Sequence, residues 1–83
     1  MGPKDDPAAF LTAVGEAVRH FREKLGISQE ELSFRAELDR TYMSGVERGV
    51  RNPTVKSLLR ITKALGVRPS AVLKRAEERG RAG

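Results

Sequence analysis

The segment Ser28–Gly49 constrains the fold most, because it holds two helix start signals within one short stretch. Its first four residues are Ser-Gln-Glu-Glu, a capping box in which the serine caps a helix and the second glutamate reaches back. We predict a short helix to about Ala36, a tight turn at 37–38, and a second helix over 40–48 that Asp39 caps. The remaining segments then serve to hold this helix pair in place.

Apolar periodicity and cap residues predict three further helices. Over 8–25, apolar residues recur at spacings of three and four, which is one stripe of an amphipathic helix. Asp6 can cap this helix, with Pro7 in its first turn. Further helices are expected over 55–65 and 69–78, bounded by threonine, glycine and proline signals. No strand-like alternation of useful length appears, so the predicted fold class is all-α with five helices.

The length of 83 residues suits one small domain with a modest core. We predict that 8–79 form this domain, that 1–7 are flexible, and that 80–83 are a polar tail. A domain of this size is only marginally stable alone, and dimerisation would bury more apolar surface.

Composition excludes several classes of site. The chain has no cysteine and one histidine, His20, which excludes disulfides, thiolate metal sites and a multi-histidine cluster. It has no Ser/His/Asp or Cys/His set and no P-loop, so we predict that it is not an enzyme and needs no cofactor or metal. No apolar run approaches the ~18–20 residues of a membrane span. The N-terminal MGPKDDPAAF lacks a signal-peptide core, and we expect a cytoplasmic protein with no membrane partner.

Charge is distributed unevenly along the chain. The net charge is +5, but residues 1–34 carry four Lys or Arg and six Asp or Glu, for −2. Residues 35–83 carry twelve Lys or Arg and five Asp or Glu, for +7. A basic half on a small domain is typical of a polyanion binder, and a merely solvated basic surface is the alternative.

The first residues of the predicted 40–48 helix have side chains suited to a DNA major groove. Arg40 can donate two hydrogen bonds to guanine O6 and N7, and Thr41 can meet a thymine methyl group. Tyr42 can offer its hydroxyl to a phosphate or its ring to a sugar, and Ser44 is a weaker candidate one turn further on. The alternatives are an ordinary solvated Arg40 and a Tyr42 packed half into the core.

Phosphate contacts are expected on either side of this helix. Free N–H groups at the start of the 29–36 helix favour an anion near Ser28 and Gln29, although Ser28 and Glu31 can simply cap the helix. The basic loop after the 40–48 helix supplies the other candidates, which are Arg48, Arg51, Asn52 and Lys56. Arg51 can reach a phosphate or enter the minor groove.

The stretch Val18–Val67 resembles a known family. It reads VRHFREKLGISQEELSFRAELDRTYMSGVERGVRNPTVKSLLRITKALGV and is similar to the helix-turn-helix family of phage Cro and repressor proteins and their bacterial relatives. GISQEEL, YMSGVERG, RNPT and ALGV fall in order at the spacings of that family. The resemblance is strongest to controller proteins of restriction–modification systems. It implies a five-helix, lambda-repressor-like domain, with the helix-turn-helix at 28–48.

The same resemblance assigns roles to individual residues. It implies DNA contacts at four positions, which are Arg40, Thr41, Tyr42 and Arg51. It also implies an ion pair between Arg22 and Glu47 that locks the first helix to the third. Gln29 would hold a phosphate or orient a base contact. Glu37 departs from the family, which usually has glycine in this turn, and a left-handed non-glycine residue costs ~1 kcal/mol.

One short helix reads only a few base pairs, so specific operators usually recruit two helices related by a two-fold axis. We therefore expect a homodimer on an inverted-repeat operator, associated with the nucleoid and able to block or contact RNA polymerase. Its expected interface is apolar and comprises Leu65, Val67, Val72 and Leu73, unless these residues close the monomer core. The alternative function is an antitoxin-type protein-interaction module that also binds its own promoter.

Overall fold

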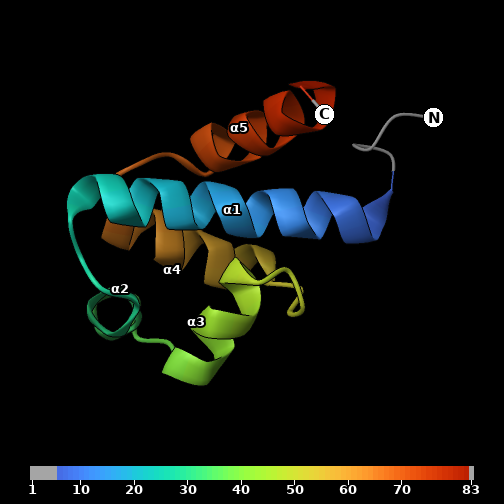
Figure 1. The fold of residues 1–83 in the computed structure, drawn as a ribbon. Coiled ribbons are helices and arrows are strands. Elements are labelled where there is room, and N and C mark those ends of the chain that lie inside the picture. Colours follow the sequence, from blue (N-terminus) through green and yellow to red (C-terminus); the bar gives the residue numbers. More distant parts are fainter. Residues whose placement is uncertain (1–5, 83) are drawn as a thin grey trace.

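Five helices make up the part of the chain that this computed structural model describes, which is the backbone of residues 6–82 and the side chains of 6–79. The helices are α1 (Pro7–Leu25), α2 (Gln29–Ala36), α3 (Arg40–Glu47), α4 (Val55–Leu65) and α5 (Pro69–Ala82). α1 runs through the middle, with α5 along one side and α2, α3 and α4 on the other (Figure 1). The predicted all-α, five-helix class is confirmed.

Local capping sets the bounds of α2 and α3. The Ser28 hydroxyl accepts a hydrogen bond from the Glu31 N–H at 3.0 Å, which is the capping interaction expected at the start of α2. The Asp39 carboxylate accepts from the N–H groups of Thr41 and Tyr42 at 2.8 and 3.2 Å at the start of α3. Both helices are eight residues long, so their placement depends on packing against the rest of the domain.

Two expected flexible ends are partly helical. Asp6 caps α1 and Pro7 is its first residue, while 1–5 lie outside the described residues. α5 continues to Ala82 instead of ending near 78, and Gly83 lies outside the described residues. A single glycine inside a helix costs only about 1 kcal/mol, and α5 is supported here by packing on α1. Near this end, Arg79 Nη2 donates to Glu16 Oε1 of α1 at 3.2 Å.

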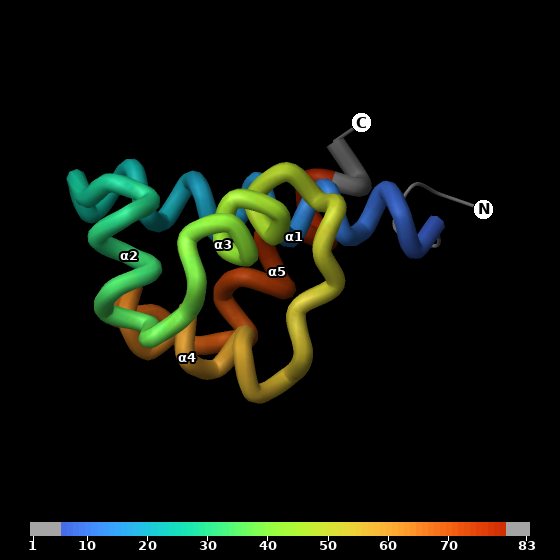
Figure 2. The backbone as a smooth tube through the Cα atoms, turned by 90° about the horizontal axis from the view of Figure 1, so that it is seen from below, coloured from blue at the N-terminus to red at the C-terminus, as the bar shows by residue number. Residues whose placement is uncertain are grey.

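Each helix contributes one completely enclosed apolar side chain to the core. These are Val18, Leu32, Met43, Ile61 and Val72, each 0% exposed. Fully burying an aliphatic side chain of this size contributes about 1.5–3 kcal/mol. α2 and α3 are thereby fixed to the same core as the longer helices, and with the loop after α3 they lie in front of α1 when the molecule is viewed from below (Figure 2).

The core also contains two of the four residues expected at a dimer interface. Leu65 and Val72 are 5% and 0% exposed, so they close the monomer and cannot offer a surface to a second copy. Val67 is half-buried and packs against the same core. Leu73 alone of the four remains exposed, at 37%. Of the two predicted α5 residues, packing therefore buries Val72 and leaves Leu73 at the surface, which apolar character alone does not distinguish.

The turn between α2 and α3 has the left-handed geometry for which glycine is usual. Glu37 has φ 57°, and its N–H donates to the Phe34 carbonyl at 3.2 Å. The Leu38 N–H donates to the Ser33 carbonyl at 3.0 Å, which completes the C-terminal cap of α2. The turn therefore keeps its shape at a cost of about 1 kcal/mol for the non-glycine residue.

Candidate nucleic-acid interface

The N-terminal end of α3 presents polar side chains to solvent. Arg40 and Thr41 are exposed, and the Arg40 guanidinium lies 3.6 Å from the Glu30 carboxylate of α2. Tyr42 is half-buried on the side of α3 that packs against the hydrophobic core. The arrangement leaves Arg40 and Thr41 as the exposed residues among the predicted base-reading residues of α3.

Ser44 is less available than the residues before it. It is half-buried, and its hydroxyl oxygen accepts a long hydrogen bond from Arg48 Nε at 3.4 Å. Arg48 is itself exposed at the C-terminal cap of α3. This contact holds the Arg48 side chain along α3.

The loop after α3 is fastened to that helix through Gly45. The Val50 and Arg51 N–H groups both donate to the Gly45 carbonyl, at 2.9 and 3.1 Å. The Arg51 side chain lies directly on the glycine, since a Cβ atom added there would meet Arg51 Cγ at 2.3 Å. The missing side chain at Gly45 is therefore what lets an exposed Arg51 lie beside α3. Sequence reasoning selected Arg51 and overlooked the glycine beneath it.

Other predicted phosphate ligands are exposed on the flanks. Asn52 lies in the loop, and Lys56 lies in the first turn of α4, where the Thr54 hydroxyl caps the helix. Ser28 is exposed at the start of α2 and accepts the capping hydrogen bond, so its hydroxyl hydrogen stays available to an anion.

A buried ion pair joins α1 to α3 behind this surface. Arg22 Nε and Nη2 donate to the two carboxylate oxygens of Glu47 at 2.7 and 3.0 Å, and Arg22 Nη1 donates to the Ile27 carbonyl at 3.0 Å. The side chains are 13% and 4% exposed. The hydrogen bond to Glu47 raises the pKa of Arg22 above its ordinary value, against an opposing effect of burial. The guanidinium therefore stays charged wherever the domain is folded, and the expected pair of Arg22 with Glu47 is present.

Gln29 belongs to the same network, a contact that the sequence did not predict for it; its role as a phosphate ligand stays a prediction. Its side-chain amide donates to Glu47 Oε1 at 3.1 Å. The amide nitrogen carries two hydrogens, so one can stay on Glu47 while the second remains available to a phosphate. In the free protein Gln29 thus ties the start of α2 to the end of α3.

No helix within 6–82 is both long and apolar enough to cross a membrane. Within the described side chains, no group of three His, Cys, Asp or Glu residues is placed to hold a metal ion.

A short helix with exposed polar residues at its N-terminus, set against a second helix by a tight turn, defines the helix-turn-helix class of DNA-binding protein. A sequence model described as Helix-turn-helix matches residues 18–72. The chain belongs to the Cro/C1-type helix-turn-helix family of transcription regulators, which confirms the resemblance and its non-enzymatic class.

Proteins similar to this chain include several restriction–modification control proteins. Control protein C.BamHI of Bacillus amyloliquefaciens is 47% identical over 60 residues, which are 71% of this chain and 74% of that protein. The crystal structure of controller protein C.AhdI from Aeromonas hydrophila has a TM-score of 0.74 and 40% identity, over 75% of this chain and 94% of that one. The C.Esp1396I tetramer, solved with its natural 35-base-pair operator, has a TM-score of 0.75 and 38% identity, over 83% and 91%.

Proposed function

We propose that this chain is a sequence-specific, double-stranded DNA-binding transcription regulator that acts as a homodimer on an inverted-repeat operator, as a restriction–modification controller. The observation that carries the proposal is the exposed Arg40 and Thr41 at the N-terminal end of α3, on a helix fixed rigidly to the core. The similarity to C.Esp1396I, whose tetramer was solved with its operator, supports the same assignment.

We assign base and phosphate contacts to individual residues from the exposure of their side chains and their positions around α3. Arg40 donates two hydrogen bonds to a guanine, and Thr41 contacts the neighbouring base. The Tyr42 hydroxyl and Ser44 contact DNA from the side of α3 that is only half-exposed. Arg51 enters from the loop on Gly45, toward a base edge or the minor groove. The phosphate contacts come from exposed groups on both flanks, which are Ser28, Arg48, Asn52 and Lys56.

Replacing Arg40 with alanine is expected to weaken operator binding by about 1–3 kcal/mol per half-site, because one bidentate base contact is lost in each. The operator is first recovered from a pool of random duplexes at ~150 mM salt, so that phosphate attraction alone does not select it. Binding of the variant to this operator and to its single-base-pair substitutions is then measured by fluorescence anisotropy. Preference should be relaxed at one position of each half-site.

Arg35→Ala is the matched control, because it removes the same charge from an exposed position. Arg35 lies on α2 and lines a hollow together with Arg60 and Lys63 of α4, and it is not among the predicted DNA contacts. It should lower the affinity for operator and scrambled duplexes equally and slightly. If wild-type protein enriches no sequence, or if Arg40→Ala behaves like Arg35→Ala, the assignment of Arg40 as a base-reading residue is wrong.

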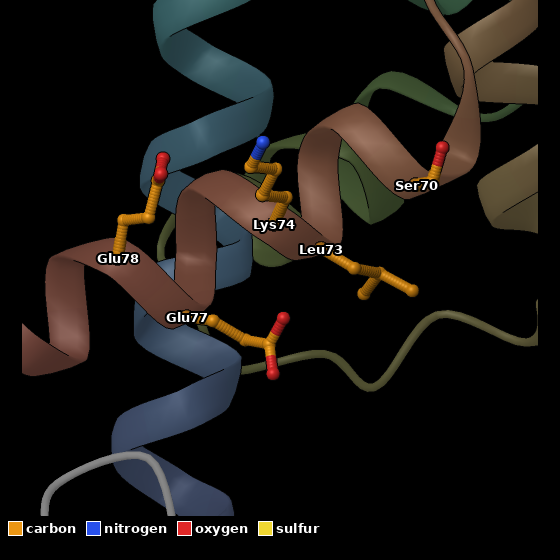
Figure 3. A pocket seen from close by; sticks show the side chains of 5 residues that line it. All are labelled: Ser70, Leu73, Lys74, Glu77 and Glu78. Atoms are coloured by element: carbon orange, nitrogen blue, oxygen red, sulfur yellow. The ribbon is translucent and has the colours of Figure 1, made fainter.

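The proposed dimer interface is centred on the exposed Leu73 of α5, with the exposed Leu59 of α4 as a second candidate. Leu73 lines an open hollow of about 490 Å³ with Ser70, Lys74, Glu77 and Glu78, and Leu73 and Glu77 project from the same side of α5 (Figure 3). Leu59 of α4 is 56% exposed. Leu73 carries the proposal because it is the one predicted interface residue that remains exposed.

Leu73→Glu should convert a dimer to a monomer at micromolar concentration, because it replaces the exposed leucine at the centre of the proposed interface with a charged side chain. Sedimentation velocity measures the change, and circular dichroism checks that the helices persist. Leu25→Glu is the control, since Leu25 is also exposed but lies at the end of α1. A wild-type chain that sediments as a monomer, or a Leu73→Glu variant that stays dimeric, would place the interface elsewhere.

The control proteins among the relatives favour a regulator over an antitoxin-type module. A regulator of this kind acts in the cytoplasm on the nucleoid. It blocks RNA polymerase or contacts it, according to where the operator lies relative to the promoter.

A further inference from the structure

An ion pair links the two helices of the helix-turn-helix at the residue that we assign to base reading. Arg40 Nη1 of α3 lies 3.6 Å from Glu30 Oε2 of α2, and both side chains are largely exposed, at 64% and 78%. The pairs Arg35–Glu31 and Arg19–Glu23 join residues four apart on one helix and follow from helix geometry alone. The Glu30–Arg40 pair instead depends on the packing of α3 against α2.

The position of Glu30 has an electrostatic consequence for any DNA that approaches α3. A carboxylate this close to the Arg40 guanidinium repels a phosphate that would otherwise pair with the arginine. A guanine edge offers neutral acceptors instead, so the carboxylate repels it far less. At 3.6 Å the pair is a charge contact and not a hydrogen bond, so the N–H donors of the guanidinium can meet guanine O6 and N7 while Glu30 stays close.

We propose that Glu30 is a specificity-determining residue, whose carboxylate beside Arg40 disfavours non-specific phosphate contacts and orients the guanidinium toward a guanine edge. The inference rests on the proposed function, because it requires Arg40 to face DNA. Exposed ion pairs are weak, and a contact of this kind shifts an equilibrium by up to about fivefold. Glu30 therefore tunes the ratio between specific and non-specific binding, and binding itself persists without it.

The chain offers a matched control for a test of this role. Glu30 and Glu31 both lie in the first turn of α2 and carry the same charge, so they affect the helix terminus and the net charge alike. Glu31 pairs with Arg35 at 2.8 Å and has no ion pair with Arg40. Glu30→Gln and Glu31→Gln are nearly isosteric changes at exposed or half-exposed sites, and circular dichroism verifies that both variants fold.

The experiment compares the dissociation constants for the selected operator and for a scrambled duplex of equal length, at several salt concentrations. Glu30→Gln should tighten scrambled-duplex binding about two- to fivefold, while operator binding stays the same or weakens, so the specificity ratio falls. Glu31→Gln should shift both constants by the same smaller factor. In an Arg40→Ala background, Glu30→Gln should have no more effect than Glu31→Gln.

Equal effects of Glu30→Gln and Glu31→Gln in wild-type protein would overturn the inference and reduce Glu30 to one charge among several. A Glu30→Gln variant that binds the operator with a higher specificity ratio would overturn it as well. Both results leave the proposed function intact, since wild-type protein still discriminates. A wild-type protein that binds operator and scrambled duplexes equally would overturn the proposed function, and this inference with it.

Discussion

Glu47→Leu is expected to cost about 3–5 kcal/mol of folding free energy, because it leaves the Arg22 guanidinium buried without its partner. The Glu47 side chain is 4% exposed and accepts three hydrogen bonds, two from Arg22 and one from Gln29. A domain of fewer than ~80 residues rarely has more than about 3–5 kcal/mol of total stability from its core. The single variant should therefore be largely unfolded at 25 °C, as urea titration followed by circular dichroism would show.

The double variant Arg22→Met/Glu47→Leu separates charge burial from packing. Replacing both partners of a buried pair by apolar residues of similar size is often close to neutral, so the double variant should be more stable than either single one. Glu31→Gln is the surface control and should cost less than about 1 kcal/mol, because the Arg35–Glu31 pair is 45% exposed on both sides. Additive losses in the double variant would show that the two side chains act independently.

The same network shows what kind of contact a sequence can predict. The starts of α2 and α3 were predictable because capping involves residues two or three apart, as at Ser28 and Asp39. The pairing of Arg22 with Glu47 spans 25 residues, and it was available only through the family resemblance. The third partner, Gln29, was predicted to contact a phosphate because it lies at a helix start. That position gives no information about the Glu47 carboxylate close to it in the fold.

Packing between helices decided the remaining differences. The sequence shows that Leu65 and Val72 are apolar and need to be covered. Whether the core or a second chain covers them depends on how the helices pack, including α5 on α1. The same holds for α5 beyond Glu78, where contact with α1 supports a helix that local signals would end. The sequence predicted a capping role for Glu31 and no contact for Glu30, whose approach to Arg40 depends on the angle at the Glu37 turn.

The crossing of α1 over α3 depends on a glycine that no sequence pattern singled out, and Gly15→Ala is expected to destabilise the domain. A Cβ atom at this position would lie 2.3 Å from the Val46 carbonyl oxygen and 2.5 Å from that of Glu47. These are backbone atoms of α3, so no side chain can rotate away and the two helices must separate. Overpacking of this kind typically costs 1–3 kcal/mol, and rigid backbone neighbours favour the upper end of about 3 kcal/mol.

Helix propensity alone would make Gly15→Ala stabilising, whereas the close approach of α3 makes it destabilising. The sign of the change in unfolding free energy therefore shows which effect is larger. Alanine is about 1 kcal/mol better than glycine inside a helix, so the net loss should be about 2 kcal/mol. Thr12→Ala is the control on the same helix, because it improves propensity at an exposed position without adding volume, and it should be neutral or slightly stabilising. Thermal unfolding measures both, and a Gly15→Ala variant as stable as wild type would show that α1 and α3 can separate freely. A destabilised variant that still folds should also lose operator affinity, since the moved segment carries Glu47 and, through α3, Arg40.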